Sequence, residues 1–257
     1  VITQSAHYSA AQLLKNSVTD EDGNVTTEFV NGKGQTVMVR KSGSPNSDTY
    51  YVYNKYNQLI AVIPPLASIV PSLGGAGGGS TLDNLCYQYR YDAKGRQVEK
   101  KLPGKGWEYF VYDKLDRVVM TQDANMGGSK KWLFTKFDKL GRTVFTGVFV
   151  SSNNYGSAGR QAEQNQLNAA TSFHESRSTG GFAATGETAY YTNAVYPTTF
   201  SAILSISYYD TYPQGSPARP SSVFGKVTID DDLSQNINTK NLPTASYVKN
   251  IENDTWT

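Results

Sequence analysis

The two histidines are the first candidates for chemistry, because imidazole serves both as a metal ligand and as a general base. His7 and His174 lie in different halves of the 257-residue chain. The run His174-Glu175-Ser176-Arg177 lacks the second histidine of a zinc-binding His-Glu-x-x-His helix. The sequence also has no Gly-x-Ser-x-Gly turn, which would present a serine nucleophile. We therefore predict no catalytic residues and no enzyme activity for this chain.

Carboxylates and glycines offer two further candidates for ligand binding. Asp230-Asp231-Asp232 supplies oxygen ligands that suit calcium, but three successive residues cannot all face one ion. We expect a solvated turn there. The stretch Gly74–Gly79 is glycine-rich, yet neither Lys-Ser nor Lys-Thr follows it, as a phosphate-binding loop requires. It is typical of a flexible connection, so we expect neither a metal nor a cofactor.

Charge and composition narrow the partners and the fold class. The net charge is +2, and Lys100-Lys101 and Lys130-Lys131 are isolated basic pairs, so no nucleic-acid partner is expected. Eighteen tyrosines and ten phenylalanines suit β-sheets with aromatic cross-strand pairs. The single cysteine, Cys86, cannot form an internal disulfide and is predicted to be a small buried apolar residue.

The recurring carboxylates belong to six copies of one four-residue turn. Each copy opens with Asp or Asn, whose side chain can accept from backbone N–H groups further along the turn. Each closes with Gly, Asn or Asp, the residues that tolerate a positive φ. Such loops join antiparallel strands, so the sequence predicts a run of β-hairpins. The opening and closing residues are Asp20 and Gly23, Asn31 and Gly34, Asn54 and Asn57, Asp92 and Gly95, Asp113 and Asp116, and Asp138 and Gly141.

Aromatic and arginine side chains recur at fixed places around these turns. An aromatic residue directly precedes the opening residue in the later copies, and an arginine directly follows the closing residue in the last three. Their shared position indicates a structural role for the turn aspartates. We expect the arginines to bridge to a carboxylate or a carbonyl of the neighbouring hairpin. The aromatics are Tyr53, Tyr91, Tyr112 and Phe137, and the arginines are Arg96, Arg117 and Arg142.

These patterns predict an all-β fold: a curved antiparallel sheet of repeated β-hairpins with two loop insertions and at most one short helix. The one helix expected is Ala158–Ala170. The chain divides into degenerate hairpins (1–63), a Pro/Gly-rich loop insertion (64–84), well-matched repeats (85–150), a polar insertion that contains the helix (151–200), and further strands that continue the sheet (201–257).

The stretch Tyr91-Asp92-Ala93-Lys94-Gly95-Arg96 resembles the tyrosine-aspartate (YD) repeat of the Rhs family, whose core pattern is Tyr-Asp-x-x-Gly-Arg followed by an apolar residue. The runs Tyr112–Val118 and Phe137–Arg142 are further copies with single substitutions, and Leu102–Trp107 resembles the family's spacer between repeats. The resemblance covers residues 18–150 well and residues 151–257 only loosely.

This resemblance implies that the repeated sheet is part of a much larger structure. In the Rhs family and related YD-repeat proteins, a long sheet spirals into a hollow shell that encloses a C-terminal toxin until delivery. The proteins are secreted or displayed on the cell surface. The partners implied are the shell and cargo that form the remainder of the same polypeptide. Secretion machinery or a chaperone is a separate candidate partner, which would explain why a segment of the parent is in view. The family's Asp-Pro-x-Gly self-cleavage segment is absent here, so we place this chain in the shell wall.

The first residues, Val1-Ile2-Thr3-Gln4, include no initiator Met and do not resemble a signal peptide, so we expect a segment of a longer secreted or cell-surface protein. The main alternative is a cell-surface adhesin that binds glycans, with Trp107, Tyr109 and Trp132 as stacking platforms. Aromatics on a sheet more often form cross-strand pairs, which favours the structural role. A β-propeller hydrolase fits poorly, because the steps between turns are unequal.

Overall fold

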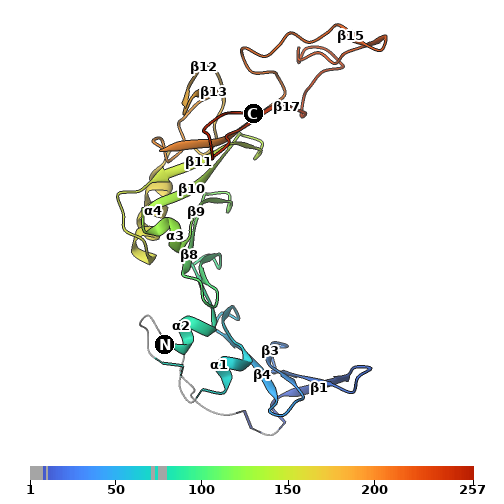
Figure 1. The fold of residues 1–257 in the computed structure, drawn as a ribbon, viewed down its shortest axis with the longest axis vertical. Helices are drawn as coiled ribbons and strands as arrows, with labels where there is room; N and C mark the ends of the chain where they lie inside the picture. The colour runs from blue at the N-terminus through green and yellow to red at the C-terminus, as the bar shows by residue number, and fades with distance from the viewer. Residues whose placement is uncertain (1–7, 10, 71–72, 75–79) are drawn as a thin grey trace. The chain divides into compact units, whose positions relative to one another are not determined.

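The structure is a computed structural model that describes residues 8–9, 11–70, 73–74 and 80–257. Its main element is a 13-stranded antiparallel sheet with the order β1-β2-β3-β4-β5-β6-β7-β8-β9-β10-β11-β14-β17 (Figure 1). The prediction of an all-β fold built from consecutive hairpins is confirmed. His7 and residues 75–79 of the glycine-rich stretch lie outside the described residues.

The chain forms two compact units, Val1–Tyr109 and Phe110–Thr257, each described here by itself. Among its described residues, the first unit holds the first seven strands, the start of the eighth and two short helices. Its elements are β1 (Leu14–Thr19), β2 (Val25–Val30), β3 (Thr36–Lys41), β4 (Ser47–Tyr53), β5 (Leu59–Ile63), α1 (Pro65–Ser68), α2 (Thr81–Leu85), β6 (Tyr87–Tyr91), β7 (Gln97–Lys101) and β8 (Trp107–Tyr112).

The second unit carries the rest of the large sheet, two small two-stranded sheets and two helices. The strands of the large sheet are β9 (Val118–Gln122), β10 (Lys131–Phe137), β11 (Thr143–Val150), β14 (Ala202–Tyr209) and β17 (Pro243–Val248). The other elements are α3 (Ala124–Gly127), α4 (Ser157–Ala169), β12 (Arg177–Ala184) with β13 (Glu187–Tyr191), and β15 (Ser222–Val223) with β16 (Lys226–Val227).

In the first unit the two faces of the sheet differ in what lies against them. Successive side chains of a strand alternate between the faces. Lys101 Nζ lies 2.8 Å from Asp83 of α2, and Gln88, which pairs with Lys101, donates to Leu82 of the same helix. Tyr89 points to the opposite face and is half-buried. Helix α2 therefore covers one face.

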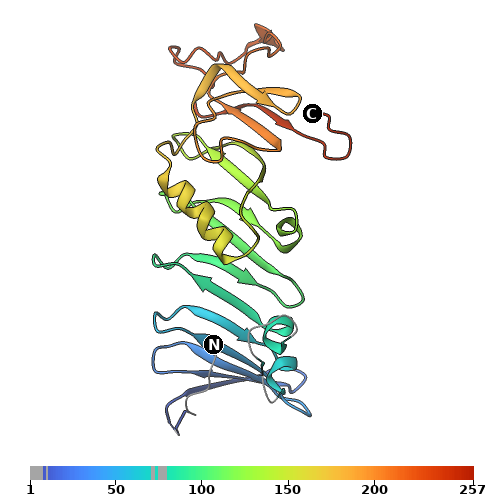
Figure 2. The same ribbon diagram turned by 90° about the vertical axis from the view of Figure 1, so that its left-hand side faces the viewer.

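In the second unit the covered face holds the larger core. Trp132, Phe134 and Phe145 are buried, and Phe145 packs against Phe182 of β12 with ring centroids 5.2 Å apart. Helix α4 lies across the strands on its side of the sheet (Figure 2). Leu133, which alternates with these aromatics, is exposed on the other face. The polar insertion therefore serves as the cover that makes this core.

The helix expected at Ala158–Ala170 is present as α4, and three single-turn helices correct the expected count of one at most. Each begins with a local feature that stabilises a helix N-terminus. Pro65 occupies the first turn of α1, Ser80 Oγ accepts from Asp83 N in α2, and Asp123 Oδ1 accepts from Met126 N in α3. Helices of four or five residues are too short to show the apolar periodicity on which the sequence prediction depended.

All six repeated turns adopt the expected conformation. Their closing residues have φ between +59° and +81°, including Asn57 and Asp116. The N–H of each closing residue donates to the carbonyl of its opening residue at 2.9–3.2 Å. In every copy, Oδ1 of the opening residue also accepts from two backbone N–H groups, at 2.8–3.1 Å. The six copies are one structural unit.

The first copy differs from the others in its place. It joins β1 to β2, and the next copy joins β2 to β3, so the two lie at opposite ends of the strands. The turns that open with Asn31, Asn54 and Asp92 share one end in the first unit, because two strands separate each from the next. One strand therefore separates the first two turns along the chain, whereas two strands separate each later pair of successive turns.

The turn beginning at Asn31 gives a matched test of the positive-φ requirement, because Gly34 has φ +76° and Gly32 has no positive φ. A Cβ at either position meets no atom within 4 Å. We expect Gly34→Val to lower the free energy of unfolding by about 1–3 kcal/mol and Gly32→Val to change it little, as measured by thermal melts. Gly95→Val should cost more, since its Cβ lies 3.3 Å from Gln58 Nε2. Equal melting temperatures for the two Asn31-turn variants would refute this requirement.

Candidate functional site

Each repeated turn is locked by a second contact between its opening residue and the residue four positions later. When the opening residue is Asp and the later one Arg, Nε donates to Oδ2 at 2.6–2.8 Å, as in Asp92–Arg96, Asp113–Arg117 and Asp138–Arg142. The copies that open with Asn31 and Asn54 carry Gln35 and Gln58 instead, and the two amides bond at 2.9 and 2.7 Å. The copies that look degenerate in sequence therefore keep the contact. We call this pair the turn lock.

This geometry adds a contact within the turn to the role expected for the arginines, and the expected bridge to a carboxylate of the neighbouring hairpin is present in Arg142–Asp210. Their first partner is the aspartate of their own turn, because an Asx turn brings the two side chains together on one side of the loop. Contacts beyond the turn come second. The guanidinium of Arg117 lies 4.1 Å from the ring centroid of Phe137 in the next hairpin, and that of Arg142 lies 4.4 Å from Tyr209.

In several copies the tyrosine before the turn hydrogen-bonds to the previous hairpin. Tyr53 Oη donates to Thr36 O at 3.1 Å, and Tyr91 Oη donates to Leu59 O at 2.8 Å. In both cases the acceptor is the fifth residue after the opening residue of the preceding turn. Tyr209 Oη donates to Thr143 O, five residues after Asp138, at 3.1 Å. Tyr209 therefore occupies a repeat position that the sequence reading missed.

Tyr209-Asp210 opens a seventh, divergent turn: Asp210 itself has a φ of +70°, which no opening residue of the six copies has, and Leu242 replaces the partner of the turn lock. Asp210 N donates to Leu242 O at 3.1 Å, as Asp138 N donates to Arg142 O at 2.9 Å. Residues 211–241, which we call the excursion, replace the short loop between the two strands. The Tyr-Asp dipeptide was the signal in the sequence. It was overlooked because Pro213 stands where the other copies have Gly, Asn or Asp.

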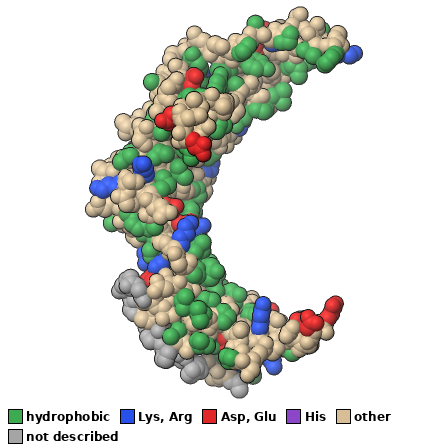
Figure 3. All heavy atoms as spheres, in the orientation of Figure 1, with side chains coloured by type: hydrophobic (Ala, Val, Ile, Leu, Met, Phe, Trp, Pro, Cys, Tyr) green, Lys and Arg blue, Asp and Glu red, His purple; other side chains and the backbone are tan. Residues whose placement is uncertain are grey.

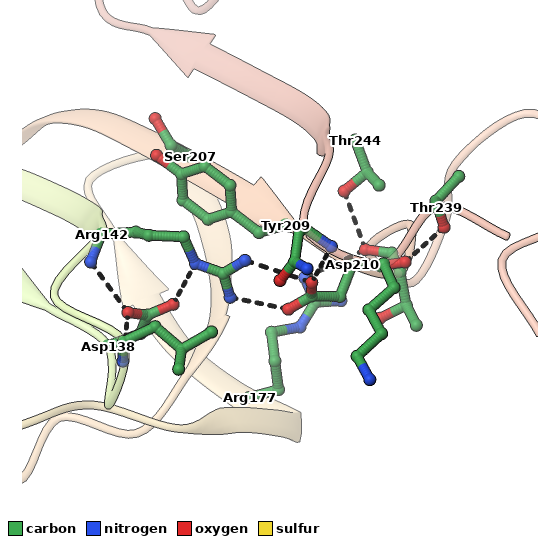
Figure 4. A network of polar contacts seen from close by, with 12 residues as sticks. Asp138, Arg142, Arg177, Ser207, Tyr209, Asp210, Thr239 and Thr244 are labelled. Carbon is green, nitrogen blue, oxygen red and sulfur yellow. Dashed lines mark hydrogen bonds and ion pairs between the residues drawn. The ribbon is translucent and has the colours of Figure 1, made fainter. Parts of the chain in front are cut away.

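Arg142 joins the sixth turn to the seventh (Figure 4). Its Nε donates to Asp138, while Nη1 and Nη2 donate to Oδ1 and Oδ2 of Asp210 at 3.1 and 2.6 Å. A two-pronged guanidinium–carboxylate pair fixes direction as well as distance. The hydrogen bond from Arg142 is the main cause that lowers the pKa of the Asp210 carboxyl. Burial opposes this shift, and both carboxylates raise the pKa of Arg142.

Arg177 fixes the start of the excursion. Its guanidinium donates to Thr211 O and Tyr212 O at 3.3 and 3.1 Å, and lies 4.7 Å from the ring centroid of Tyr208. Thr244 Oγ1 donates to Thr211 O at 2.9 Å (Figure 4). Thr239 Oγ1 donates to Asp210 O from the far end of the excursion. Both ends of this segment are therefore held at the sheet by hydrogen bonds.

A buried ion pair anchors the polar insertion to β10. Lys136 Nζ lies 3.0 Å from Glu175 Oε1 and donates to Asn193 Oδ1 at 2.6 Å, and both charged side chains are almost completely buried. Glu175 also accepts from the N–H groups of Ala194 and Val195. Burial lowers the pKa of Lys136, and Glu175 opposes that shift. The adjoining cavity measures about 10 Å³, which suffices for one water. The arrangement is suited to structural anchoring.

Helix α4 is fixed by two neighbouring side chains. The buried Glu163 accepts from Ser151 Oγ, from Asn153 Nδ2 at 2.9 Å and from Tyr196 Oη at 2.5 Å. Gln164 accepts from Tyr112 N at 3.0 Å and donates to Tyr112 O at 2.7 Å, the bonds that a neighbouring strand would otherwise supply. Neither contact could be predicted from the sequence, because the partners are far apart in the chain.

The three aromatics expected to form a glycan platform do not form an exposed one. Trp132 and Tyr109 are only 2% and 4% exposed, and Trp107 stacks with the guanidinium of Arg90 at 4.1 Å. Trp132 faces the core because it alternates with Leu133, and the insertion covers that side. The burial of two of the three rings removes the main support for the adhesin alternative.

Other predicted residues take ordinary structural places. Cys86 is buried, as expected, and burial raises the pKa of its thiol. His174 is exposed, and Asp230 pairs with Arg219 in an exposed turn. On the face that Figure 3 shows, Lys and Arg side chains are dispersed among apolar and neutral ones. In the described part of the chain, no helix has the length and hydrophobicity that crossing a bilayer requires.

Comparisons with known proteins give matches among solved structures alone. No family model matches the sequence, and no curated protein matches it. The chain is similar to one in the crystal structure of TcdB2-TccC3-Cdc42, with a TM-score of 0.39 and 10% identity over 91% of this chain. It is also similar to one in the crystal structure of TcdB2-TccC3 without the hypervariable C-terminal region, with a TM-score of 0.39 and 12% identity over 91% of this chain. The match spans 12% of the length of each of those chains.

The Arg142–Asp210 pair predicts how stability depends on pH. The folded pKa of Asp210 is lower than the unfolded value, so the pair stabilises the fold above the unfolded pKa, and this contribution is lost as pH falls through the folded pKa. We expect the melting temperature to fall with acidification below about pH 5, and to fall less steeply in Asp210→Asn. Glu187→Gln, at an exposed position of β13, is the control. Parallel pH profiles for Asp210→Asn and the wild type would contradict the assignment.

Because Lys136 and Glu175 form a buried pair, we expect the effects of their substitutions on the unfolding free energy to be non-additive. Lys136→Met leaves the Glu175 carboxylate buried without its cation, which should cost about 3–5 kcal/mol of unfolding free energy. The double variant Lys136→Met/Glu175→Gln should recover part of that loss. Arg40→Met, which breaks a half-exposed pair with Asp48, should cost about 1 kcal/mol or less. A double variant less stable than Lys136→Met would show that the pair does not act as the anchor.

Proposed function

We propose that this chain is a wall segment of a larger secreted or cell-surface YD-repeat (Rhs-like) protein, whose sheet encloses or presents a C-terminal toxin. The observation that carries the proposal is the turn lock. It keeps its geometry in all six predicted turns, although the pair is Asp–Arg in three, Asn–Gln in two and Asp–Asn in the first. A unit that tolerates such exchange is suited to building a long, regular wall.

The contacts between hairpins support growth by addition. The Tyr-to-carbonyl bonds and the Arg–aromatic stacks link successive hairpins. In an array whose units contact only their neighbours, stability is approximately the sum of local terms, so the number of units is free to increase. The edge strands β1 and β17 are the positions at which further hairpins of the same polypeptide would pair.

The proposed role is containment and not catalysis. The charged groups that a catalytic reading would select are engaged with one another: Lys136 with Glu175, and Arg142 with two carboxylates. In each unit helices lie against one face of the sheet, which suits a wall whose two surfaces differ. The partners are the remainder of the polypeptide and its cargo, with secretion machinery or a chaperone during export.

The decisive experiment is to determine the mass and terminal sequences of the native polypeptide, followed by limited proteolysis. We expect a chain several times larger than 28.1 kDa, with further Tyr-Asp turns and a C-terminal domain that resists protease until the sheet is unfolded. A native chain that ends near Thr257 would overturn the proposal, because so few hairpins cannot enclose a domain. A C-terminal domain cleaved as fast with the folded sheet as without it would overturn containment.

A further inference from the structure

The tip of the excursion holds a backbone conformation that its sequence does not favour. Strands β15 and β16 are joined by the two-residue turn Phe224-Gly225, with φ of +49° and +70°. Asn-Gly is the preferred sequence for such a turn, and a bulky residue at positive φ is strained. Phe224 is nevertheless 100% exposed, so the fold gains no packing from it. A strained and fully exposed aromatic at a loop tip points to a binding role.

Apolar side chains lie on both faces of this small hairpin. Val223 pairs with Lys226 on one face, and Val227 pairs with Ser222 on the other. Val223 is 47% exposed and Val227 is 86% exposed. A groove on a protein would contact one face and leave the other in water. A lipid interface surrounds an inserted tip, and it therefore accommodates apolar groups on every side.

The charge of this hairpin fits an anionic surface. Between Pro213 and Ile229 the ionisable side chains are Arg219 and Lys226, both cationic, whereas Asp230, Asp231 and Asp232 follow beyond the hairpin, away from its tip. Arg219 pairs with Asp230 at the base of the hairpin. No ion pair is recorded for Lys226 with any residue that the structure describes. Lys226 thus stands two residues from Phe224, where it can contact a lipid phosphate or carboxylate.

The ends of the excursion are fixed while its tip is presented. Asp210, Thr211 and Tyr212 are held by Arg142 and Arg177, and Thr239 returns to Asp210 O. The segment that carries β15 extends away from the sheet of its unit (Figure 1). A tip on an anchored base reaches a surface without requiring the sheet to rearrange.

We propose that the Phe224 tip inserts into the interface of an anionic lipid bilayer, with Val223 and Val227 entering beside it and Lys226 contacting the headgroups. One aromatic and two valines give a weak and reversible association, which lipid charge strengthens. The inference rests on the excursion alone and is independent of the proposed function of the sheet.

The test is co-sedimentation of the full 257-residue chain with phosphatidylcholine–phosphatidylserine vesicles, and with vesicles of phosphatidylcholine alone. The key variant is Phe224→Asn, because Asn suits the positive φ and should keep or improve folding while removing the aromatic ring. We expect it to lower the partition coefficient about tenfold. Lys226→Gln should weaken binding to the vesicles that contain phosphatidylserine and leave binding to pure phosphatidylcholine vesicles unchanged. The matched control is Leu140→Ser, which removes a side chain that is 67% exposed on another turn of the same unit.

Binding of the wild type to anionic vesicles, with loss in Phe224→Asn and none in Leu140→Ser, supports the proposal. Three results would overturn it: no sedimentation of the wild type, unchanged binding of Phe224→Asn, or an equal loss in Leu140→Ser. Thermal melts of each variant separate a binding defect from unfolding. A stable Phe224→Asn chain that still binds would show that a different surface meets the lipid.

Discussion

The sheet depends on one local constraint, a backbone residue held at positive φ and closed by an Asx side chain. In each turn a single oxygen of Asp or Asn accepts two backbone N–H groups, and the other terminal atom of the same side chain bonds the residue four positions on. One short side chain thereby sets the loop length, the strand register and the direction of the following side chain. Since register fixes which residues face the core, the placement of the buried aromatics follows from these turns.

Much of this could be predicted from sequence because the information is local. Gly95 and Asp92 are three residues apart, and their types alone indicated the conformation that the structure shows. Strand existence followed from the aromatic runs that flank the turns. The contact between Asp210 and Arg142 was not predictable in the same way, because an insertion separates the two residues. Neither was the pairing of Lys136 with Glu175, which depends on how residues 151–200 fold back over the strands.

The aromatic residues show why exposure is harder to infer than secondary structure. Trp132 and Leu133 are neighbours in β10, yet one is buried and the other is exposed, since only one face of that strand is covered. The alternation was visible in the sequence, but the identity of the covered face was not. It depends on α4, whose polar residues Glu163 and Gln164 make buried hydrogen bonds. A polar insertion thus covers one side of an apolar core.

The seventh turn keeps one closing bond of the repeat, although residues 211–241 stand where the other copies have three residues between the two bonded positions. Asp210 N still donates to the carbonyl of Leu242, the residue before β17, and Arg142 and Tyr209 keep their places in the repeat. The strands therefore do not depend on what the loop contains. Each turn of this kind is therefore a site at which a new segment can be inserted during evolution. The segments displayed at the turns can then diversify while the sheet itself is inherited unchanged.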